Sequence, residues 1–582
     1  MPLNITAASA PVASRTTSGG FKTSEGTLYV SKPYRSKTSK KLRALITFAP
    51  RESTFDTNNA RSSTNEFRGF FTLFWISMFL FTVRTYIRSM ETNGYILNLR
   101  FASQFSRDAI TLALSDAALV LSTSICVPFA KAISKGWIQY YPAGVIIQHT
   151  IQTLVLFTAI IWTFNRQWPW VQSGFLTLHS LVMVMKMHSY MTVNGELAYI
   201  HEQATHLMQK MRERTDALGG WEKAIDVAKS RRAEIDAKTG VVDSESEPEH
   251  TPNGTPPVPQ GSTTSYVDPQ TATTLRNRLA AVTGTTPKDS PLDSSVVDPR
   301  THPLVDHPDE DLSAMAQDYS EMQTELTSGG PHPVTWPNNI SLRHFADYQL
   351  VPTLVYELEY PRTERIRPLY LFEKTVATFG TFALLYTVTE TFILPLTPTP
   401  DQSFFRSLLD LALPFMIAYL LLFFIIFECI CNGFAELSHF ADRQFYEDWV
   451  SHRYIILGIL MADSLSQWNS TSWDEFSRKW NKPVHAFLLR HVYASTISTY
   501  KLSKTSALAV TFLLSACAHE LVMAIVTQKF RFYLFALQLA QIPLIAISRI
   551  PMIKRNKLLG NIVFWLGLYA GFPLLCVAYC AY

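Results

Sequence analysis

Nine stretches of mostly apolar residues alternate with polar segments along this chain of 582 residues. A helix needs about 20 predominantly apolar residues to cross a bilayer, and each stretch is close to this length. The pattern therefore predicts an all-α, polytopic membrane protein with about nine transmembrane helices. Two stretches are short, and the first contains Arg84. The predicted spans are 67–88, 109–130, 144–164, 171–187, 371–396, 404–431, 506–528, 531–549 and 560–582.

Two polar segments divide the chain into parts. Residues 1–66 are rich in Ser, Thr and Asn, and residues 238–335 in Pro, Ser, Thr, Asp and Gly. Such compositions bury too little apolar surface to offset the entropy of ordering the chain. We expect 1–66 to be a disordered cytosolic tail without a cleaved signal peptide. The insertion 201–335 is expected to be cytosolic, first helical and then disordered. It separates an N-terminal transmembrane part, 67–200, from a C-terminal transmembrane part, 336–582.

Basic residues give the predicted spans an orientation. A cluster of Lys and Arg precedes the first span, and most loop Lys and Arg residues follow the even-numbered spans. Cytosolic loops carry such an excess of positive charge. The loop 397–403 has no Lys or Arg and is expected to be lumenal, whereas Arg531 fits this arrangement badly. With a cytosolic N-terminus, nine spans place the C-terminus on the lumenal side.

The overall composition excludes several classes of protein. The chain is 47% hydrophobic and only 17% charged, with a formal net charge of +4. This charge is too small, and the basic residues too scattered, for nucleic-acid binding. All six cysteines lie in apolar stretches, without the spacing of a zinc site or a disulfide framework. We therefore expect no metal site.

The seventh apolar stretch contains an ionisable pair, His519 and Glu520. Polar groups within a span are costly and are candidates for function by default. Ser515 lies four residues before His519, so the two share one face of a helix. A histidine here is suited to general-base catalysis, because its unperturbed pKa lies near neutrality. The alternative is a histidine that only bonds to neighbouring helices.

The loop before this span is the second polar focus. Residues 472–495 interleave aromatic residues with Arg478, Arg490 and further basic residues, which suits a helix at the bilayer surface or binding of a phosphate-bearing amphiphile. Asn481 is followed two residues later by Pro483, which is also the pattern of a helix start. The sequence leaves helix capping and catalysis open for Asn481, and ordinary loop charge open for the arginines.

Several long motifs in this region resemble one known family. They are FYEDW at 445–449, WNSTSWDEFSRKWNKPVHAFLLRHVY at 468–493 and SACAHE at 515–520, supported by PTLVYELEYPRTERIR at 352–367 and KMHSY at 186–190. The chain resembles the fungal type of sterol O-acyltransferase, within the membrane-bound O-acyltransferases. The resemblance covers about 67–200 and 336–582.

The resemblance implies a reaction and roles for particular residues. The family's catalytic histidine and asparagine match His519 and Asn481, which would converge in an intramembrane chamber. There, acyl-CoA would serve as co-substrate and a sterol as acceptor, with no cofactor. Glu520 would either orient the histidine or point away from it. The resemblance also implies an endoplasmic reticulum membrane and a homo-dimer or homo-tetramer. The further candidate substrate-binding residues are Tyr446, Trp449, Trp480, His485, Arg478, Arg490, Ser515 and Glu520.

One family motif is interrupted in this chain. The family pattern FYxDWWNS is continuous, but here eighteen residues, Val450 to Gln467, separate Trp449 from Trp468. We interpret 450–467 as a retained intron translated in frame; the alternative is an inserted loop or a short re-entrant helix. If the segment is present in the protein, we expect weak or no activity, because catalytic geometry tolerates little displacement.

Two other functions remain as alternatives. Diacylglycerol O-acyltransferases share the FYxDWWN motif and the Asn/His pair, although STSWDEFSRKWN, which ends at Asn481, is more like the sterol branch. A membrane transporter or lipid-sensing scaffold would also place ionisable groups within spans. No inverted repeat of broken helices is visible in the sequence, which disfavours a transporter.

Overall fold

A computed structural model describes most of the chain. The described residues are 21–23, 26–28, 48–53, 56, 68–96, 101–239, 302–328, 333–446, 470, 472–551, 553 and 556–581. Trp449 and the segment 450–467 lie outside them, as does most of the predicted tail 1–66. The chain divides into two compact units. The smaller comprises Met1–Arg51, Asn194–Asn339 and Ser498–Lys501, and the larger comprises Glu52–Val193, Ile340–Ile497 and Leu502–Tyr582.

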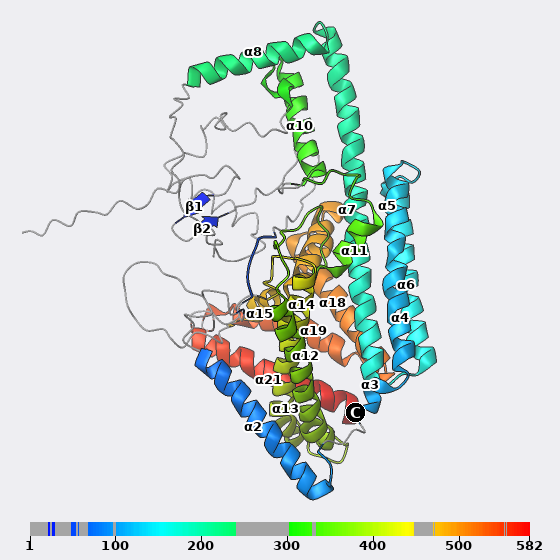
Figure 1. Ribbon diagram of the computed structural model, residues 1–582, viewed down its shortest axis with the longest axis vertical. Coiled ribbons are helices and arrows are strands. Elements are labelled where there is room, and N and C mark those ends of the chain that lie inside the picture. Colours follow the sequence, from blue (N-terminus) through cyan, green and yellow to red (C-terminus); the bar gives the residue numbers. More distant parts are fainter. Residues whose placement is uncertain are drawn as a thin grey trace, which may run out of the picture. The chain divides into compact units, whose positions relative to one another are not determined.

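The larger unit is built from helices, which confirms the predicted fold class. Its first helices are α2 (Arg68–Asn93), α3 (Ser103–Ser106), α4 (Ala109–Ser122), η1 (Thr123–Ile125), α5 (Cys126–Ser134), η2 (Tyr140–Gly144) and α6 (Val145–Arg166). Next come the start of α7 (Trp170–Ala217), α11 (Leu342–Leu350), α12 (Pro368–Val388), η4 (Thr389–Ile393), η5 (Leu394–Leu396), α13 (Phe404–Phe423), η6 (Phe424–Ile430) and α14 (Cys431–Leu437). The last are α15 (Trp473–Trp480), α16 (Lys482–Phe487), η7 (Leu488–Ala494), α17 (Ser495–Tyr500), α18 (Lys504–Thr527), α19 (Tyr533–Ser548) and α21 (Lys557–Ala581) (Figure 1).

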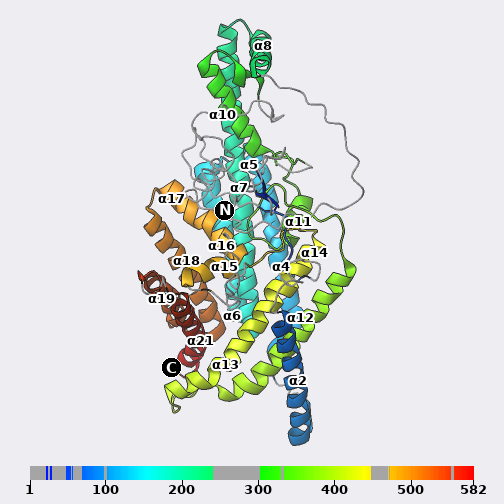
Figure 2. The same ribbon diagram turned by 90° about the vertical axis from the view of Figure 1, so that its left-hand side faces the viewer.

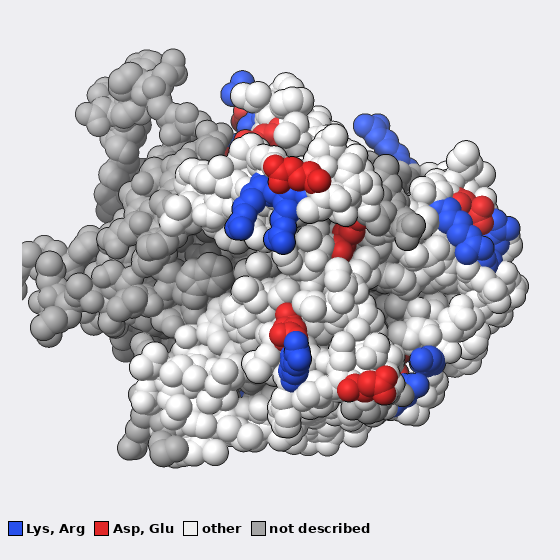
Figure 3. All heavy atoms as spheres, turned by 90° about the horizontal axis from the view of Figure 1, so that it is seen from below, with Lys and Arg blue, Asp and Glu red and all other residues white. Residues whose placement is uncertain are grey.

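Every predicted span overlaps a helix. By length and composition, six helical stretches among the described residues are able to cross a membrane: Ala109–Ser134, Tyr140–Arg166, Pro368–Leu396, Phe404–Leu437, Lys504–Thr527 and Leu558–Ala581. The apolar α19 is shorter, and the remaining two predicted spans lie in α2 and α7. The multi-pass prediction is confirmed, whereas the number nine is not. On the face seen in Figure 3, the Lys, Arg, Asp and Glu residues of the described part lie in small separate groups.

Sequence features explain where several helices of the C-terminal transmembrane part begin. Pro368 occupies the first turn of α12, where its missing N–H costs nothing. The Ser472 side chain accepts a hydrogen bond from Glu475 N and starts α15, and Ser503 starts α18 in the same way. Two stretches of wide π-helical turns, η6 and η7, lie on either side of the FYEDW and WNKP motifs in the chain. Such turns occur often at functional sites.

The smaller unit has its own apolar core. It contains the end of α7, α8 (Trp221–Thr239), η3 (Pro303–Asp306) and α10 (Glu310–Leu326), besides a short hairpin of β1 (Phe21–Thr23) and β2 (Gly26–Leu28). The first two helices bury Met211, Ala224 and Ala228 against apolar residues of η3 and α10. Figure 2 shows α8 and α10 in a second view.

Within the insertion, the structure differs from the sequence-based expectation. Residues 302–328 are folded, although the composition of 238–335 predicts disorder throughout. Leu312 and Ala316 lie one turn apart on α10 and are fully buried with Leu304. The average composition of the long polar segment hides this short amphipathic helix, which Asp309 caps by accepting a bond from Leu312 N at 2.9 Å. The residues 240–301 lie outside the described part.

Candidate active site

His519 lies in the middle of α18, and the helix itself fixes the orientation of its ring. The Nδ1 atom is 2.7 Å from the main-chain oxygen of Ser515, one turn earlier. A carbonyl oxygen only accepts, so Nδ1 carries the proton and Nε2 keeps its lone pair. The Ser515 hydroxyl is 3.5 Å from Nδ1, at the limit of hydrogen bonding. The imidazole is exposed and holds the tautomer that a general base requires.

Glu520 points away from His519 and joins three helices. The residue is 2% exposed, and its carboxylate accepts hydrogen bonds from Phe532 N at 2.7 Å and Phe535 N at 3.0 Å. The Tyr579 hydroxyl of α21 donates to it at 3.1 Å. A carboxylate at the first turn of α19 is favoured by that turn's free N–H groups and dipole. Of the two orientations left open by the sequence, the structure has the one in which Glu520 does not orient the histidine; its contacts are those of a structural residue rather than of a substrate-binding one.

Asn481 caps the start of α16. Its Oδ1 accepts a hydrogen bond from Val484 N at 3.1 Å, with Pro483 in the first turn. This confirms the helix-start interpretation of the sequence and does not exclude the catalytic one. Because Oδ1 faces the helix, the side-chain NH2 points away from it, as a donor for another group. The helix continues as η7, which packs against α18, the helix of His519.

The FYEDW motif lies beside Asn481. The main-chain N–H of Lys482 donates to the oxygen of Phe445 at 3.1 Å. Tyr446 is buried, with its ring 5.0 Å from that of Phe423, and Phe423 is 4.6 Å from Trp480. Trp480 also stacks on Tyr419 at 4.7 Å. Tyr446 and Trp480 thus belong to an aromatic cluster that supports the asparagine, and in this structure they pack on protein rather than line an open cavity.

The basic candidates differ in their availability. Arg490 is paired with Glu357, and its side chain is largely buried. Arg478 pairs with Asp474 at 3.1 Å across one turn of α15, but its side chain remains 57% exposed. An exposed pair of this kind is weak and easily exchanged for another anion. Of the two arginines, Arg478 is therefore the one better placed to meet a phosphate.

His485 lies near two basic residues, Lys482 of its own helix α16 and Arg478 of the preceding helix α15. Burial, together with the charges of Arg478 and Lys482, lowers the pKa of His485 to about 4, against a smaller opposing effect of Asp474. The ring is therefore neutral at physiological pH. A neutral imidazole offers hydrogen bonds without adding charge beside the basic residues.

Two groups of this region were missed in the sequence. Glu428 is fully buried within the stretch Phe404–Leu437 and bonds to Lys374 at 2.8 Å. Its presence inside a predicted span was the available signal. His491 lies on η7, where its Nε2 is 2.7 Å from the Ser189 hydroxyl, and its ring is 5.3 Å from that of His188 in the KMHSY motif. Nothing in the spacing of these residues predicted that pair.

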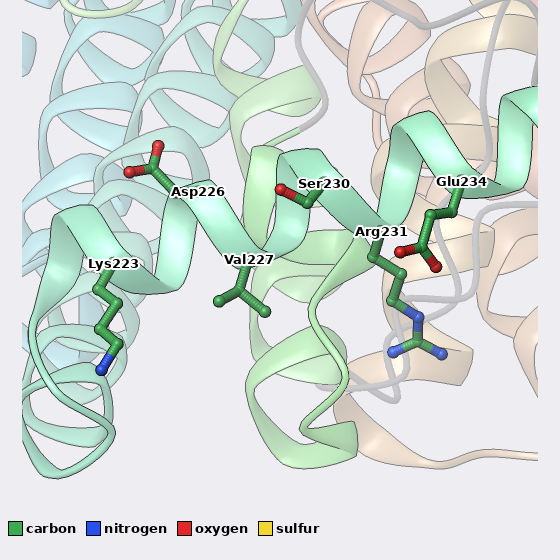
Figure 4. Close-up of a pocket in the computed structure, with 6 residues that line it drawn as sticks. All are labelled: Lys223, Asp226, Val227, Ser230, Arg231 and Glu234. Carbon is green, nitrogen blue, oxygen red and sulfur yellow. The ribbon is translucent and has the colours of Figure 1, made fainter.

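A hollow on α8, in the smaller unit, is of a different kind (Figure 4). Acidic and basic side chains alternate along one helix there, which is typical of a solvated helix face. Within the described ranges, no group of three His, Cys, Asp or Glu residues is placed to hold a metal ion. The residues lining the hollow are Lys223, Asp226, Val227, Ser230, Arg231 and Glu234.

Comparison with known proteins decides the family. The profile of the MBOAT, membrane-bound O-acyltransferase family matches residues 110–581. The chain belongs to the membrane-bound O-acyltransferase family. The match contains every described candidate residue of the site, covers the N-terminal transmembrane part from residue 110 onward, and covers nearly all of the C-terminal one.

The relatives of this family member include sterol O-acyltransferases of fungi. It is 32% identical to probable sterol O-acyltransferase 1 of Schizosaccharomyces pombe, over 91% of this chain and 85% of the relative. It is also 32% identical to sterol O-acyltransferase 2 of Candida albicans, over 92% and 78% of the two chains. The resemblance inferred from the motifs is thereby confirmed. Diacylglycerol O-acyltransferase 1 of Dictyostelium discoideum is 33% identical, but over only 42% of this chain.

Proposed function

We propose that this protein transfers a fatty acyl group from acyl-CoA to the hydroxyl of a sterol, giving a sterol ester and CoA. The similarity to fungal sterol O-acyltransferases over most of the chain supports the reaction. The structural observation that carries it is His519 in a helix able to span a membrane, with Nδ1 bound to the Ser515 carbonyl and Nε2 available. A general base within a membrane-spanning helix can reach the hydroxyl of an acceptor that is dissolved in the bilayer, as a sterol is.

His519 begins the reaction in this proposal. Its Nε2 takes the proton of the sterol hydroxyl as the oxygen attacks the thioester carbonyl. The new C–O bond forms, the C–S bond breaks, and the proton passes to the departing CoA sulfur. Thiolate is a good leaving group, so neither a metal nor a covalent enzyme intermediate is needed for the balance of the step.

Asn481 stabilises the charge that develops during this attack. The cap bond to Val484 N holds Oδ1 and directs the amide NH2 outward. A fixed donor aimed at a developing oxyanion is worth far more than a mobile one, because no reorganisation is required. We assign Arg478 and neutral His485 to the approach of acyl-CoA, Arg478 to its phosphates. The endoplasmic reticulum membrane and a homo-dimer or homo-tetramer remain part of the proposal.

The interruption at 450–467 belongs to the proposal too. The segment follows Trp449 and precedes the motif that ends in Asn481, so a retained intron here would separate Trp449 from Trp468, which are adjacent in the family pattern. Sequencing the transcript tests this: we expect messages that lack the segment, and a uniform message that contains it would refute the intron. Purified protein without 450–467, offered a sterol and separately diacylglycerol with labelled acyl-CoA, tests the acceptor. Sterol ester is expected; labelled triacylglycerol alone would instead support the diacylglycerol reaction.

A further inference from the structure

A carboxylate with several hydrogen-bond donors is buried beside the FYEDW motif. Glu428, on the π-helical segment η6, is 0% exposed and receives hydrogen bonds from three separate parts of the chain. The Lys374 ammonium of α12 lies 2.8 Å from Oε1, the Ser53 hydroxyl 2.5 Å from Oε2, and the Tyr446 hydroxyl 3.1 Å from Oε2. A buried carboxylate persists only when such partners offset its lost hydration. Asn432, one turn later, also donates to Oε2, at 3.4 Å. Removing one of these donors therefore disturbs the others.

One of these donors leads to Asn481 through two ring contacts. Tyr446 packs its ring on Phe423, and Phe423 packs on Trp480, the residue before Asn481. The same motif is fastened a second time, by the bond from Lys482 N to Phe445 O. Glu428 thus holds the tyrosine that supports the start of α16. Its influence on Asn481 passes through Tyr446 rather than through a direct bond.

Another donor comes from a segment far away in sequence. Ser53 and Asp56 are each 1% exposed, although they fall in the region expected to be a disordered tail. Asp56 pairs with Arg367 at 3.0 Å, and Arg367 also binds Glu436 at 3.2 Å. This segment is therefore anchored twice, by a neutral hydroxyl on Glu428 and by a carboxylate on Arg367. An apolar or acidic side chain in place of Ser53 would lack the donor that Glu428 receives.

We propose that Glu428 is a positioning residue for Asn481, and that the hydrogen bond from Ser53 holds Glu428 in place. Negative charge introduced at Ser53 is then expected to lower turnover. This inference rests on the proposed function, in which Asn481 takes part in acyl transfer. A carboxylate at position 53 faces the Glu428 carboxylate at contact distance, and the two repel each other. The repulsion displaces either the N-terminal segment or the carboxylate, and with the latter Tyr446. Because catalysis depends on precise placement of the reacting groups, displacement of Tyr446 is expected to lower the rate about tenfold or more.

The experiment compares the kcat of Ser53→Thr, Ser53→Ala and Ser53→Asp in the form without 450–467, which is the form expected to be active. Threonine keeps the donor and is expected to retain wild-type kcat, alanine to lower it severalfold, and aspartate to lower it about tenfold. KM for acyl-CoA is expected to stay within about twofold, because Ser53 is not at the substrate. The control is Glu373→Gln, which removes an exposed carboxylate 3.6 Å from the same Lys374 without touching Tyr446.

A coupling measurement separates positioning from general loss of structure. If Ser53 acts through Glu428, the Ser53→Asp penalty shrinks in the Glu428→Gln background, since the repulsion is gone. Protease protection of the segment around Ser53 reports its docking independently of activity, and Ser53→Asp is expected to reduce it. Unchanged kcat and protection in Ser53→Asp, or fully additive effects with Glu428→Gln, would overturn this inference. Absence of sterol ester from every form, with normal protection, would instead overturn the proposed function.

Discussion

The side chain of His519 donates from Nδ1 to the main-chain oxygen of Ser515 at 2.7 Å. The partner is the backbone, so the serine side chain contributes little. Ser515→Ala is expected to change kcat by less than about tenfold, whereas His519→Ala is expected to lower it by about 10²–10⁴. Steady-state kinetics of both variants check this. A loss in Ser515→Ala as large as that in His519→Ala would show that the hydroxyl takes part.

Asn481 combines two roles that substitution can separate. The variant Asn481→Asp retains a side-chain oxygen able to cap Val484 N, but lacks the amide donor. We expect this variant to fold like the wild type and lose about 10²–10³ in kcat. Asn481→Ala is expected to lose the cap as well, at a cost of about 1 kcal/mol in stability. Thermal unfolding and steady-state kinetics of the two variants distinguish the roles. An Asn481→Asp enzyme with wild-type kcat would show that Asn481 serves only to cap the helix.

Glu520 is expected to affect stability more than chemistry. Glu520→Gln places an amide where Phe532 N and Phe535 N donate, and a buried donor left unpaired costs about 1–3 kcal/mol. The melting temperature should fall, while the kcat of the folded fraction stays near that of the wild type. Tyr579→Phe is the matched control, because it removes one donor to the same carboxylate. A large selective loss of kcat in Glu520→Gln would instead show that Glu520 takes part in the reaction.

His485 makes a distinct prediction for pH dependence. Its pKa falls from 6.5 to about 4 in the folded protein, so the unfolded chain binds the proton more readily. The stability that the neutral ring contributes is complete above pH of about 6.5 and is lost as the pH falls toward about 4. His485→Gln should therefore flatten unfolding stability across that window and leave the shape of the pH–rate profile at pH above about 6.5 unchanged. A variant as acid-sensitive as the wild type would contradict the assignment.

The features that could be predicted from the sequence are those that depend on residues close together in the chain. The apolar stretches marked all the helices of the described residues that are long and apolar enough to cross a membrane, and the pairing of His519 with Ser515 follows from a spacing of four residues. Long-range partners could not be predicted in this way. Arg490 was a candidate for phosphate binding, and nothing in the sequence indicated that it pairs with Glu357, which lies far away in the chain. The docking of Ser53 on Glu428 depends on two distant segments folding together.

Two further differences between prediction and structure arise because composition and apolar length were judged over long segments of the chain. The segment 238–335 is polar as a whole, yet Leu312 and Ala316 give α10 an apolar face that buries against α8 and α7. The count of nine spans was based on apolar length alone. In the structure α7 runs from Trp170 to Ala217, so its apolar beginning is only the first part of a longer, increasingly polar helix.

Sterol ester formation in cells that lack their own esterification is the most direct test of the central claim. Cells fed labelled fatty acid would express this chain, the chain without 450–467, or the shortened chain carrying His519→Ala. The account predicts labelled sterol ester from the shortened chain, little or none from the full chain, and none from the His519→Ala form. Sterol ester from the His519→Ala form at the level of its parent, or triacylglycerol in place of sterol ester, would contradict it.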